Sequence, residues 1–304
     1  MKVYRYGVDK IDHEPRASLT LGAFDGVHLG HRALLDRVLE GDHPTVVTFD
    51  PHPQHVLGKQ PDRLRILTPV HEKLAKLELV GIERVVIVPF SLALASWSAD
   101  HFLKGLLIDT IGMNRLVVGF NHSFGRNRAG NLEFMKTKAP EYEYELVVVD
   151  ARLVEEIAVS STRIRNALRD GDLFAANSSL GRAYRLEASV VHGDGRGRNL
   201  GFPTANLKLA DPDQLVPAEG VYAVRVHCDD ESHDGVGSIG RKETFGDNPL
   251  TLEVHLFDIN LDLYDKVVQV EWVDFLREQE AYNSADALVE QMRKDAVMAR
   301  KALM

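Results

Sequence analysis

The sequence predicts two domains, a parallel α/β domain followed by a small antiparallel β-barrel that ends in a helix. In the first half, continuous apolar runs alternate with helical segments, as expected for strands buried on both faces of a parallel sheet. In the second half, short strands alternate apolar and polar residues between turns, which is typical of small barrels. A chain of 304 residues accommodates two such domains, which we expect to occupy residues 1–182 and 183–304.

The sheet of the first domain is predicted from five apolar segments. These are residues 19–21, 46–49, 85–90, 116–118 and 146–149. A helix follows the first segment, with Ala33, Leu34 and Val38 on its apolar side, and another is expected at residues 70–81, where Gly81 ends it. Ligands of a doubly wound sheet bind at the carboxyl ends of its strands, so a site is expected in the loops that follow these segments.

The second domain is predicted from alternating segments at residues 221–226, 251–257 and 267–272. In the middle segment, Glu253 and His255 lie on the face opposite the apolar side chains. A strand carboxylate faces water by default, so Glu253 becomes a functional candidate only if its face lines a pocket. A helix at residues 284–302 should pack outside the barrel, with an inward face that contains Leu288, Met292 and Met298.

Composition narrows the class of protein. The formal net charge of -9 argues against a general nucleic-acid or membrane-surface binder. Cys228 is the one cysteine, which excludes an internal disulfide and a cysteine-based zinc cluster. The first residues lack the apolar core of a signal peptide, and no apolar run is long enough to span a bilayer. We therefore expect a cytoplasmic protein with small-molecule partners, and a homo-oligomer is compatible with the sequence.

The loop after the first strand carries the strongest local signal. A tight turn separates this strand from a helix, and His28 and His31 share one side of the first helical turn because they are three residues apart. Free N–H groups and the positive end of the helix dipole favour anions there. An ordinary junction with two surface histidines is the alternative, which the surrounding glycines and aspartate disfavour. Further candidates for phosphate binding in this loop are Gly22, Phe24, Asp25, Gly26 and Gly30.

Two later loops also follow predicted strands. Residues 50–53 contain two prolines and form either a stiff turn or part of a site. Residues 119–130 combine three glycines, two arginines and the amide of Asn121. That composition suits a loop that holds a phosphate and contacts a base, and it equally suits a solvated loop.

A second anion site is predicted where the helix after residue 159 begins. Ser161, Thr162 and Arg165 supply cap hydroxyls and a guanidinium group, although an ordinary helix cap would have the same residues. Two helix-start sites at the strand ends of one sheet suggest a triphosphate held between them.

A basic, glycine-rich run at residues 192–198 opens the second half and leads into residues 200–206. Such a run is typical of a mobile flap over a polyanion, and a flexible linker is the alternative. The candidates for phosphate binding in it are Gly193, Gly195, Gly197 and Arg198.

These motifs together resemble one family. The first loop is similar to the H-x-G-H signature of nucleotidyltransferases, in the longer form G-x-F-D-G-x-H-x-G-H. With residues 48–53, residues 119–125 and Ser160-Ser-Thr-x-x-Arg165, it resembles the FMN adenylyltransferase module of the bacterial bifunctional riboflavin kinase/FAD synthetases. Gly201-Phe-Pro-Thr-Ala-Asn206 resembles the ATP and magnesium motif of their kinase module, and residues 251–256 resemble the strand with its catalytic glutamate. The resemblance covers the whole chain and implies a nucleotidyltransferase-like sheet followed by a riboflavin kinase barrel.

The resemblance implies that the C-terminal module phosphorylates riboflavin to FMN with ATP. Glu253 would then accept the proton of the ribityl hydroxyl as general base. Thr204 and Asn206 would help to hold Mg²⁺ and the ATP phosphates next to Pro203, while the flap at residues 193–198 closes over them.

For the N-terminal module, the resemblance implies that the FMN phosphate attacks the α-phosphorus of a second ATP, giving FAD and pyrophosphate. His28 and His31 would stabilise the developing charge from one side. The other side would be formed by Ser161, Thr162 and Arg165. Asn121 would contact the nucleotide or the flavin phosphate, and both reactions use Mg²⁺ in this family. Candidates for stacking on the flavin ring are Phe120, Phe124 and Tyr222.

Some positions depart from the family's pattern and motivate alternatives. Within residues 237–246, Ser238 and Glu243 stand where the family often has asparagine and proline, and the added charge would weaken ATP binding. Residues 121–123 also lack charged groups that some relatives carry. An adenylyltransferase with a weakened kinase is therefore one alternative. A different H-x-G-H enzyme, such as a relative of the aminoacyl-tRNA synthetases, is disfavoured by the net charge and the absence of a Lys-Met-Ser-Lys-type loop. A non-catalytic flavin-binding regulator is disfavoured because the candidate catalytic residues are all present.

Overall fold

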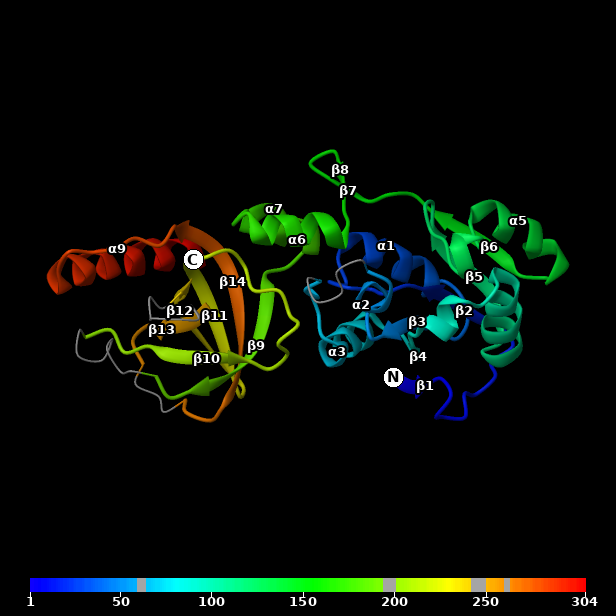
Figure 1. The fold of residues 1–304 in the computed structure, drawn as a ribbon, viewed down its shortest axis with the longest axis horizontal. Helices are drawn as coiled ribbons and strands as arrows, with labels where there is room; N and C mark the ends of the chain where they lie inside the picture. The colour runs from blue at the N-terminus through cyan, green and yellow to red at the C-terminus, as the bar shows by residue number, and fades with distance from the viewer. Residues whose placement is uncertain (59–63, 194–200, 242–249, 260–262) are drawn as a thin grey trace. The chain divides into compact units, whose positions relative to one another are not determined.

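The computed structural model describes residues 1–58, 64–193, 201–241, 250–259 and 263–304. The chain divides into two compact units, Met1–Ser161 and Thr162–Met304, each of which is described by itself. Figure 1 traces the elements of both units. Within the described ranges, no helix is long and apolar enough to cross a membrane.

The first unit is built around a six-stranded sheet in the order β1-β4-β3-β2-β5-β6, in which every neighbouring pair is parallel. Its strands are β1 (Lys2–Arg5), β2 (Ala17–Leu21), β3 (Thr45–Asp50), β4 (Arg84–Pro89), β5 (Met113–Gly119) and β6 (Glu145–Val149). The predicted parallel α/β fold and its five predicted strands are confirmed. β1 was missed because only one of its four side chains, Tyr4, is buried, so that it has no apolar run.

Side chains from the two faces of this sheet enter two separate cores. Neighbours along a strand, such as Val46 and Val47, belong to different cores because successive side chains point to opposite faces. Each fully buried valine or leucine stabilises the fold by about 1.5–3 kcal/mol. The covering helices are α1 (Leu29–Val38), α2 (Pro53–Leu57), α3 (Val70–Val80), α4 (Leu92–Ala95), the π-type helix η2 (His101–Thr110), the 3-10 turn η3 (Arg126–Arg128) and α5 (Leu132–Glu141).

The predicted helix positions hold, with one adjustment of face. α3 ends at Gly81, whose left-handed conformation (φ 102°) is the one expected of a terminal glycine. On α1 the buried side chains are Leu35 and Val38, whereas Ala33 and Leu34 are only partly buried. After β6, a short hairpin of β7 (Leu153–Val154) and β8 (Ile157–Ala158) precedes the next helix.

The second unit contains a closed antiparallel barrel with strand order β10-β13-β12-β11-β14-β9, which confirms the predicted barrel. The hairpin between β11 and β12 turns at Asp229 and Asp230, as its turn residues predicted. Cys228, just before this turn, is buried and free. The elements are α6 (Ser161–Arg169), α7 (Leu173–Leu180), β9 (Tyr184–Val191), β10 (Ala205–Leu209), β11 (Gly220–Cys228), β12 (Glu231–Arg241), β13 (Leu250–Leu256), β14 (Val267–Arg277) and α9 (Ala285–Leu303).

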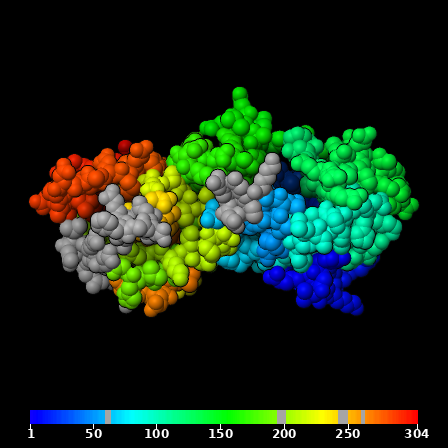
Figure 2. Space-filling view, in the orientation of Figure 1, coloured from blue at the N-terminus to red at the C-terminus, as the bar shows by residue number. Residues whose placement is uncertain are grey.

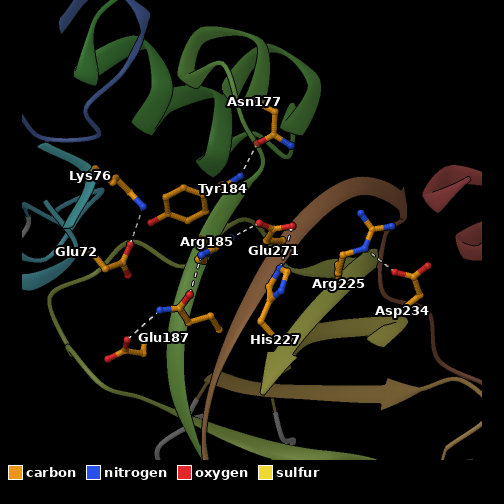
Figure 3. Close-up of polar contacts among 11 residues, drawn as sticks. Glu72, Lys76, Asn177, Tyr184, Arg185, Glu187, Arg225, His227, Asp234 and Glu271 are labelled. Carbon is orange, nitrogen blue, oxygen red and sulfur yellow. Dashed lines mark hydrogen bonds and ion pairs between the residues drawn. The ribbon is translucent and has the colours of Figure 1, made fainter. Parts of the chain in front are cut away.

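Polar side chains connect the strands of the barrel wall (Figure 3). Glu271 on β14 contacts the guanidinium of Arg185 on β9 and lies 3.2 Å from Nε2 of His227 on β11. Burial raises the pKa of Glu271, but these two contacts outweigh it and leave the pKa below its ordinary value. Asn177 joins α7 to the barrel, because its amide donates to the Trp272 carbonyl (3.0 Å) and accepts from the Tyr184 N–H (2.8 Å). These contacts join neighbouring elements and lie outside the cavity described below.

The C-terminal helix α9 packs along the barrel (Figures 1 and 2), but not with all of the predicted inward residues. Met298 is 38% exposed, so its predicted inward position was wrong. The buried residues of this helix are Asp295 and Ala299. Asp295 is tolerated there because Arg277 of β14 donates to both of its carboxylate oxygens, at 2.9 and 2.7 Å.

We expect this ion pair to matter for the stability of the second unit. Asp295→Ala leaves the Arg277 guanidinium, which is only 16% exposed, without its partner. The loss should be about 3–5 kcal/mol in the free energy of unfolding, measured by urea denaturation. Glu290→Ala is the control on the same helix, because its pair with Lys294 is exposed and should contribute little. Equal losses for the two variants would contradict the assignment.

Candidate active sites

The histidine loop between β2 and α1 forms the first candidate site. His28 caps α1, and its Nδ1 accepts a hydrogen bond from the backbone N–H of His31 (3.2 Å). The two imidazole rings stack with their centroids 3.6 Å apart and their planes 13° from parallel, which confirms that they share one side of the helix start. Val27 just before them has φ +41°, a conformation that β-branched residues rarely adopt. Such local strain is typical of functional loops.

Electrostatics keep His31 of this pair uncharged. Burial lowers the pKa of His31 well below its ordinary value, and the neighbouring His28 and Lys73 lower it further. His31 is therefore neutral at pH 7. Its buried Nδ1 has no hydrogen-bond partner within the described residues, which is unusual for a buried polar atom and typical of a group that awaits a ligand.

Asp25 holds the shape of the loop through hydrogen bonds to distant parts of the chain. It is 2% exposed, and its Oδ1 accepts hydrogen bonds from the backbone N–H groups of Leu67 (2.8 Å) and Thr68 (3.0 Å). Its carbonyl oxygen accepts from the hydroxyl of Ser161 (2.8 Å). Gly26 is also buried, and its φ of +91° requires glycine. Both residues are buried within the loop and hold its shape, and their role in phosphate binding stays a prediction.

Two adjoining cavities lie at the carboxyl ends of the strands. The first, here called the histidine cavity, measures about 360 Å³, and the second, the aromatic cavity, about 770 Å³. Leu21, Asn121 and His122 line both. The predicted residues that line the histidine cavity are Gly22, Phe24, His28, Gly30, His31, Phe120, Asn121 and Ser161. The residues that line the aromatic cavity include Phe49, Pro53, Phe90, Phe102 and Phe124.

The remaining predictions for this site fall in three groups. Thr162 and Arg165 lie on α6 in the second unit, where Thr162 is exposed and Arg165 is buried. Phe124 lines the aromatic cavity, and the loop at residues 50–53 contributes Pro53 to its wall. Tyr222 is fully buried in the barrel, with its hydroxyl bonded to the Ala218 carbonyl, so its proposed stacking on a flavin was wrong.

The aromatic cavity was largely missed by the sequence analysis. Phe49 and Phe90 were assigned to strands, and Phe102 lies on η2, where an apolar residue predicts only burial. The available signal was position, because Phe49 and Phe90 end two of the predicted apolar segments, at the edge where a site is expected.

The second candidate site lies on the barrel. Thr204, just before β10, donates its hydroxyl hydrogen bond to Oε2 of Glu253 on β13 (3.1 Å). Asn206 is the direct cross-strand partner of Glu253. A Cβ added to Gly193 would lie 2.0 Å from the Asn206 amide nitrogen, so this side chain packs against the Gly193 backbone and needs a glycine there. Residues far apart in the chain thus meet at one place.

This face of β13 lines a cavity of about 250 Å³, the condition under which Glu253 becomes a functional candidate. Leu252, Val254 and Leu256 are buried on the opposite face, as predicted. The cavity is lined by Phe202, Thr204, Val221, Val236, Ser238, Glu253, His255, Arg277, Gln279, Glu280, Tyr282, Leu288, Met292 and Asp295.

Two further details concern the rim of this cavity. Ser238 lies in strand β12, opposite Glu253, and its hydroxyl accepts from the Gln279 amide (2.9 Å). His255 Nδ1 contacts the Pro203 carbonyl at 2.8 Å, which ties the segment before β10 to β13. Predicted residues outside the described ranges are Gly195, Gly197, Arg198 and Glu243.

The donors around Glu253 fit a hard cation. Thr204, Asn206 and Glu253 present hydroxyl, amide and carboxylate oxygens, which are ligands that Mg²⁺ prefers. No cluster of three or more histidine, cysteine or acidic side chains suited to a metal occurs in the described part of the chain. These oxygens therefore suit a magnesium ion that one or two protein groups hold together with the substrate phosphates.

Comparison with known proteins places this geometry in a family. The FAD synthetase family model matches residues 10–163, and the riboflavin kinase family model matches residues 180–303. Bifunctional riboflavin kinase/FMN adenylyltransferases from Listeria monocytogenes and Escherichia coli K12 are each 35% identical. The first match covers 91% of this chain and 89% of the relative, and the second 99% and 97%.

The full fold also has a solved counterpart. A crystal structure from Streptococcus pneumoniae, titled a macrolide-efflux protein, superposes with a TM-score of 0.89 at 31% identity and covers 99% of both chains. Two family models in the expected order and relatives matched over nearly their whole length lead to one conclusion. The chain belongs to the bifunctional riboflavin kinase/FMN adenylyltransferases.

Proposed function

We propose that the second unit phosphorylates riboflavin with ATP to FMN, and that the first unit adenylylates FMN with a second ATP to FAD, releasing pyrophosphate. The observation that carries the proposal is that each unit has its own cavity and its own reactive side chains. The barrel cavity contains the Thr204–Glu253 contact, and the histidine cavity contains the stacked His28 and His31. We place the enzyme in the cytoplasm, where a single free cysteine is unremarkable.

In the kinase reaction, the ribityl 5′-hydroxyl oxygen forms a bond to the γ-phosphorus of ATP, and ADP leaves. Glu253 accepts the hydroxyl proton, and the hydrogen bond from Thr204 orients its carboxylate. Thr204 and Asn206 would hold Mg²⁺, which when bound neutralises the phosphate charge. The cavity between the barrel and α9 has apolar side chains, among them Leu288 and Met292, that suit a flavin ring.

In the adenylyl transfer, an oxygen of the FMN phosphate forms a bond to the α-phosphorus, and the bond to pyrophosphate breaks. The nucleophile is already anionic, so the protein has to position it and stabilise charge rather than remove a proton. His28 and the neutral His31, with the start of α1, would act from one side. Ser161, which lines the same cavity, is proposed for the other. The aromatic cavity, next to the histidine cavity, would hold the flavin ring.

Incubation of the chain with riboflavin, excess ATP and Mg²⁺ tests both reactions, with the flavins separated by chromatography over time. FMN should appear first and then decline as FAD accumulates. Riboflavin that stays unchanged while added FMN becomes FAD would favour the alternative of an adenylyltransferase with a weakened kinase, for which Ser238 beside Glu253 is the suspect. Conversion of neither flavin by the folded chain would refute the proposal.

A further inference from the structure

His122 lies at the candidate site of the first unit, and the proposed reactions give it no role. It lies in the loop between β5 and η3, where its backbone N–H donates to the Gly119 carbonyl (3.0 Å). Its side chain lines both the histidine cavity and the aromatic cavity. The other two residues shared by these cavities are Leu21, which has no polar side-chain atom, and Asn121.

The imidazole of His122 has no hydrogen-bond partner among the described residues. Its Nε2 is shielded from solvent and unpaired, and the ring makes only an aromatic contact with Phe124, at a centroid distance of 6.2 Å. Burial, assisted by the nearby Arg128, lowers the pKa of His122 to about 4, so the ring is neutral at pH 7. A neutral imidazole still carries one N–H and one lone pair, and leaving the shielded Nε2 unpaired costs free energy.

The ligand that would meet this ring follows from the arrangement of the cavities. If the flavin ring occupies one cavity and the nucleotide the other, the phosphate that joins them in the product must lie at their shared wall. A neutral donor suits the attacking phosphate, because it orients the oxygen without a full positive charge that would withdraw electron density from the nucleophile.

We propose that His122 donates a hydrogen bond to the FMN phosphate at the wall shared by the two cavities, as a positioning residue for adenylyl transfer. This inference rests on the proposed function of the first unit and adds the residue that discriminates FMN from riboflavin there. Asn121, the other polar group of that wall, remains available to the nucleotide.

Kinetics of FAD formation test it with one pair of variants. His122→Phe keeps a planar ring and removes both nitrogens, whereas His122→Asn keeps a donor. His122→Phe should raise the KM for FMN about ten- to hundredfold, the effect of losing one hydrogen bond to a charged group. The KM for ATP should stay within about twofold of that of the unsubstituted chain. ATP binding does not use the lost contact, and effects at independent positions are separate. His122→Asn should recover part of the loss.

Riboflavin provides the matched ligand, because it lacks the phosphate. In chains that also carry Glu253→Gln, which should not phosphorylate it, riboflavin acts as a competitive inhibitor against FMN. Its inhibition constant should be the same with and without His122→Phe, whereas a merely structural role would weaken both flavins equally. An unchanged KM for FMN, or equal weakening of both flavins, would overturn the inference.

A second measurement separates this inference from the proposed function. In a chain with ¹⁵N-labelled histidine, addition of FMN should shift the ring signal that is missing from His122→Phe by more than riboflavin does, because only FMN carries the phosphate. A signal that ignores FMN overturns the inference even where FAD forms. Failure of the unsubstituted chain to make FAD would refute the proposed function instead.

Discussion

Glu253→Gln should slow FMN formation from riboflavin by about 100- to 10,000-fold in kcat, while the same chain still converts added FMN to FAD. Glutamine keeps the size of the side chain and can still accept the hydrogen bond from Thr204, so the local geometry is preserved. It cannot accept the proton of the attacking hydroxyl. The two rates are measured separately, by chromatography of flavins after incubation with riboflavin or with FMN.

The matched control is Glu187→Gln. Glu187 is also a strand carboxylate of the barrel, on β9, and it accepts a hydrogen bond from Gln269 away from the cavity. Its substitution should leave FMN formation within about twofold, as is usual for surface positions. Full kinase activity of Glu253→Gln would exclude this carboxylate as the base, and parallel loss of both activities would indicate a folding defect.

The second large effect is expected at the histidine pair. His28→Asn and His31→Gln should each lower the rate of FAD formation by about 100- to 1,000-fold, the usual cost of removing one preorganised donor from a developing charge. Asparagine at position 28 still caps α1, so the helix start should survive. Because the two rings stack, the double variant should lose less than the product of the single effects.

FMN formation by the second unit serves as the internal reference for these variants and should not change. His13→Gln, at an exposed position of the first unit, is the control substitution and should leave both rates intact. A histidine variant that forms FAD at the full rate would refute the proposed role of this pair. A variant that loses thermal stability along with activity would show that the histidines act through folding.

The parts of the fold that depend on local pattern could be predicted. Apolar runs buried on both sheet faces leave little choice of structure, and Gly81 marks a helix end by its own conformation. β1 had no such pattern, because its position in the sheet depends on its pairing with β4, which is distant in the sequence. Met298 was misassigned because a 3.6-residue period tolerates neighbouring faces, and the inward position belongs to Asp295, whose partner Arg277 lies on another element.

For the candidate sites too, features that depend on local spacing could be predicted, and those that depend on distant contacts could not. His28 and His31 are three residues apart, so spacing alone placed their rings together. Thr204 and Glu253 are separated by 49 residues, and only the resemblance to a family suggested that they belong to one site. The bonds of Asp25 to the N–H groups of residues 67 and 68 could not be predicted, because these residues are far along the chain.

The strand register of the barrel determines on which face Glu253 lies. Asn206 on β10, Glu253 on β13 and Ser238 on β12 stand in one row across three neighbouring strands. A slip of β13 by one residue would turn Glu253 into the apolar interior and bring Leu252 to the cavity, because side chains alternate between faces. In a closed barrel with no free edge, a slipped strand would mismatch both of its neighbours at once. Closure of the barrel therefore disfavours the slipped pairing, because a chain with that pairing would lose stability at two strand interfaces. The correct position of the Glu253 carboxylate is thus coupled to the stability of the barrel.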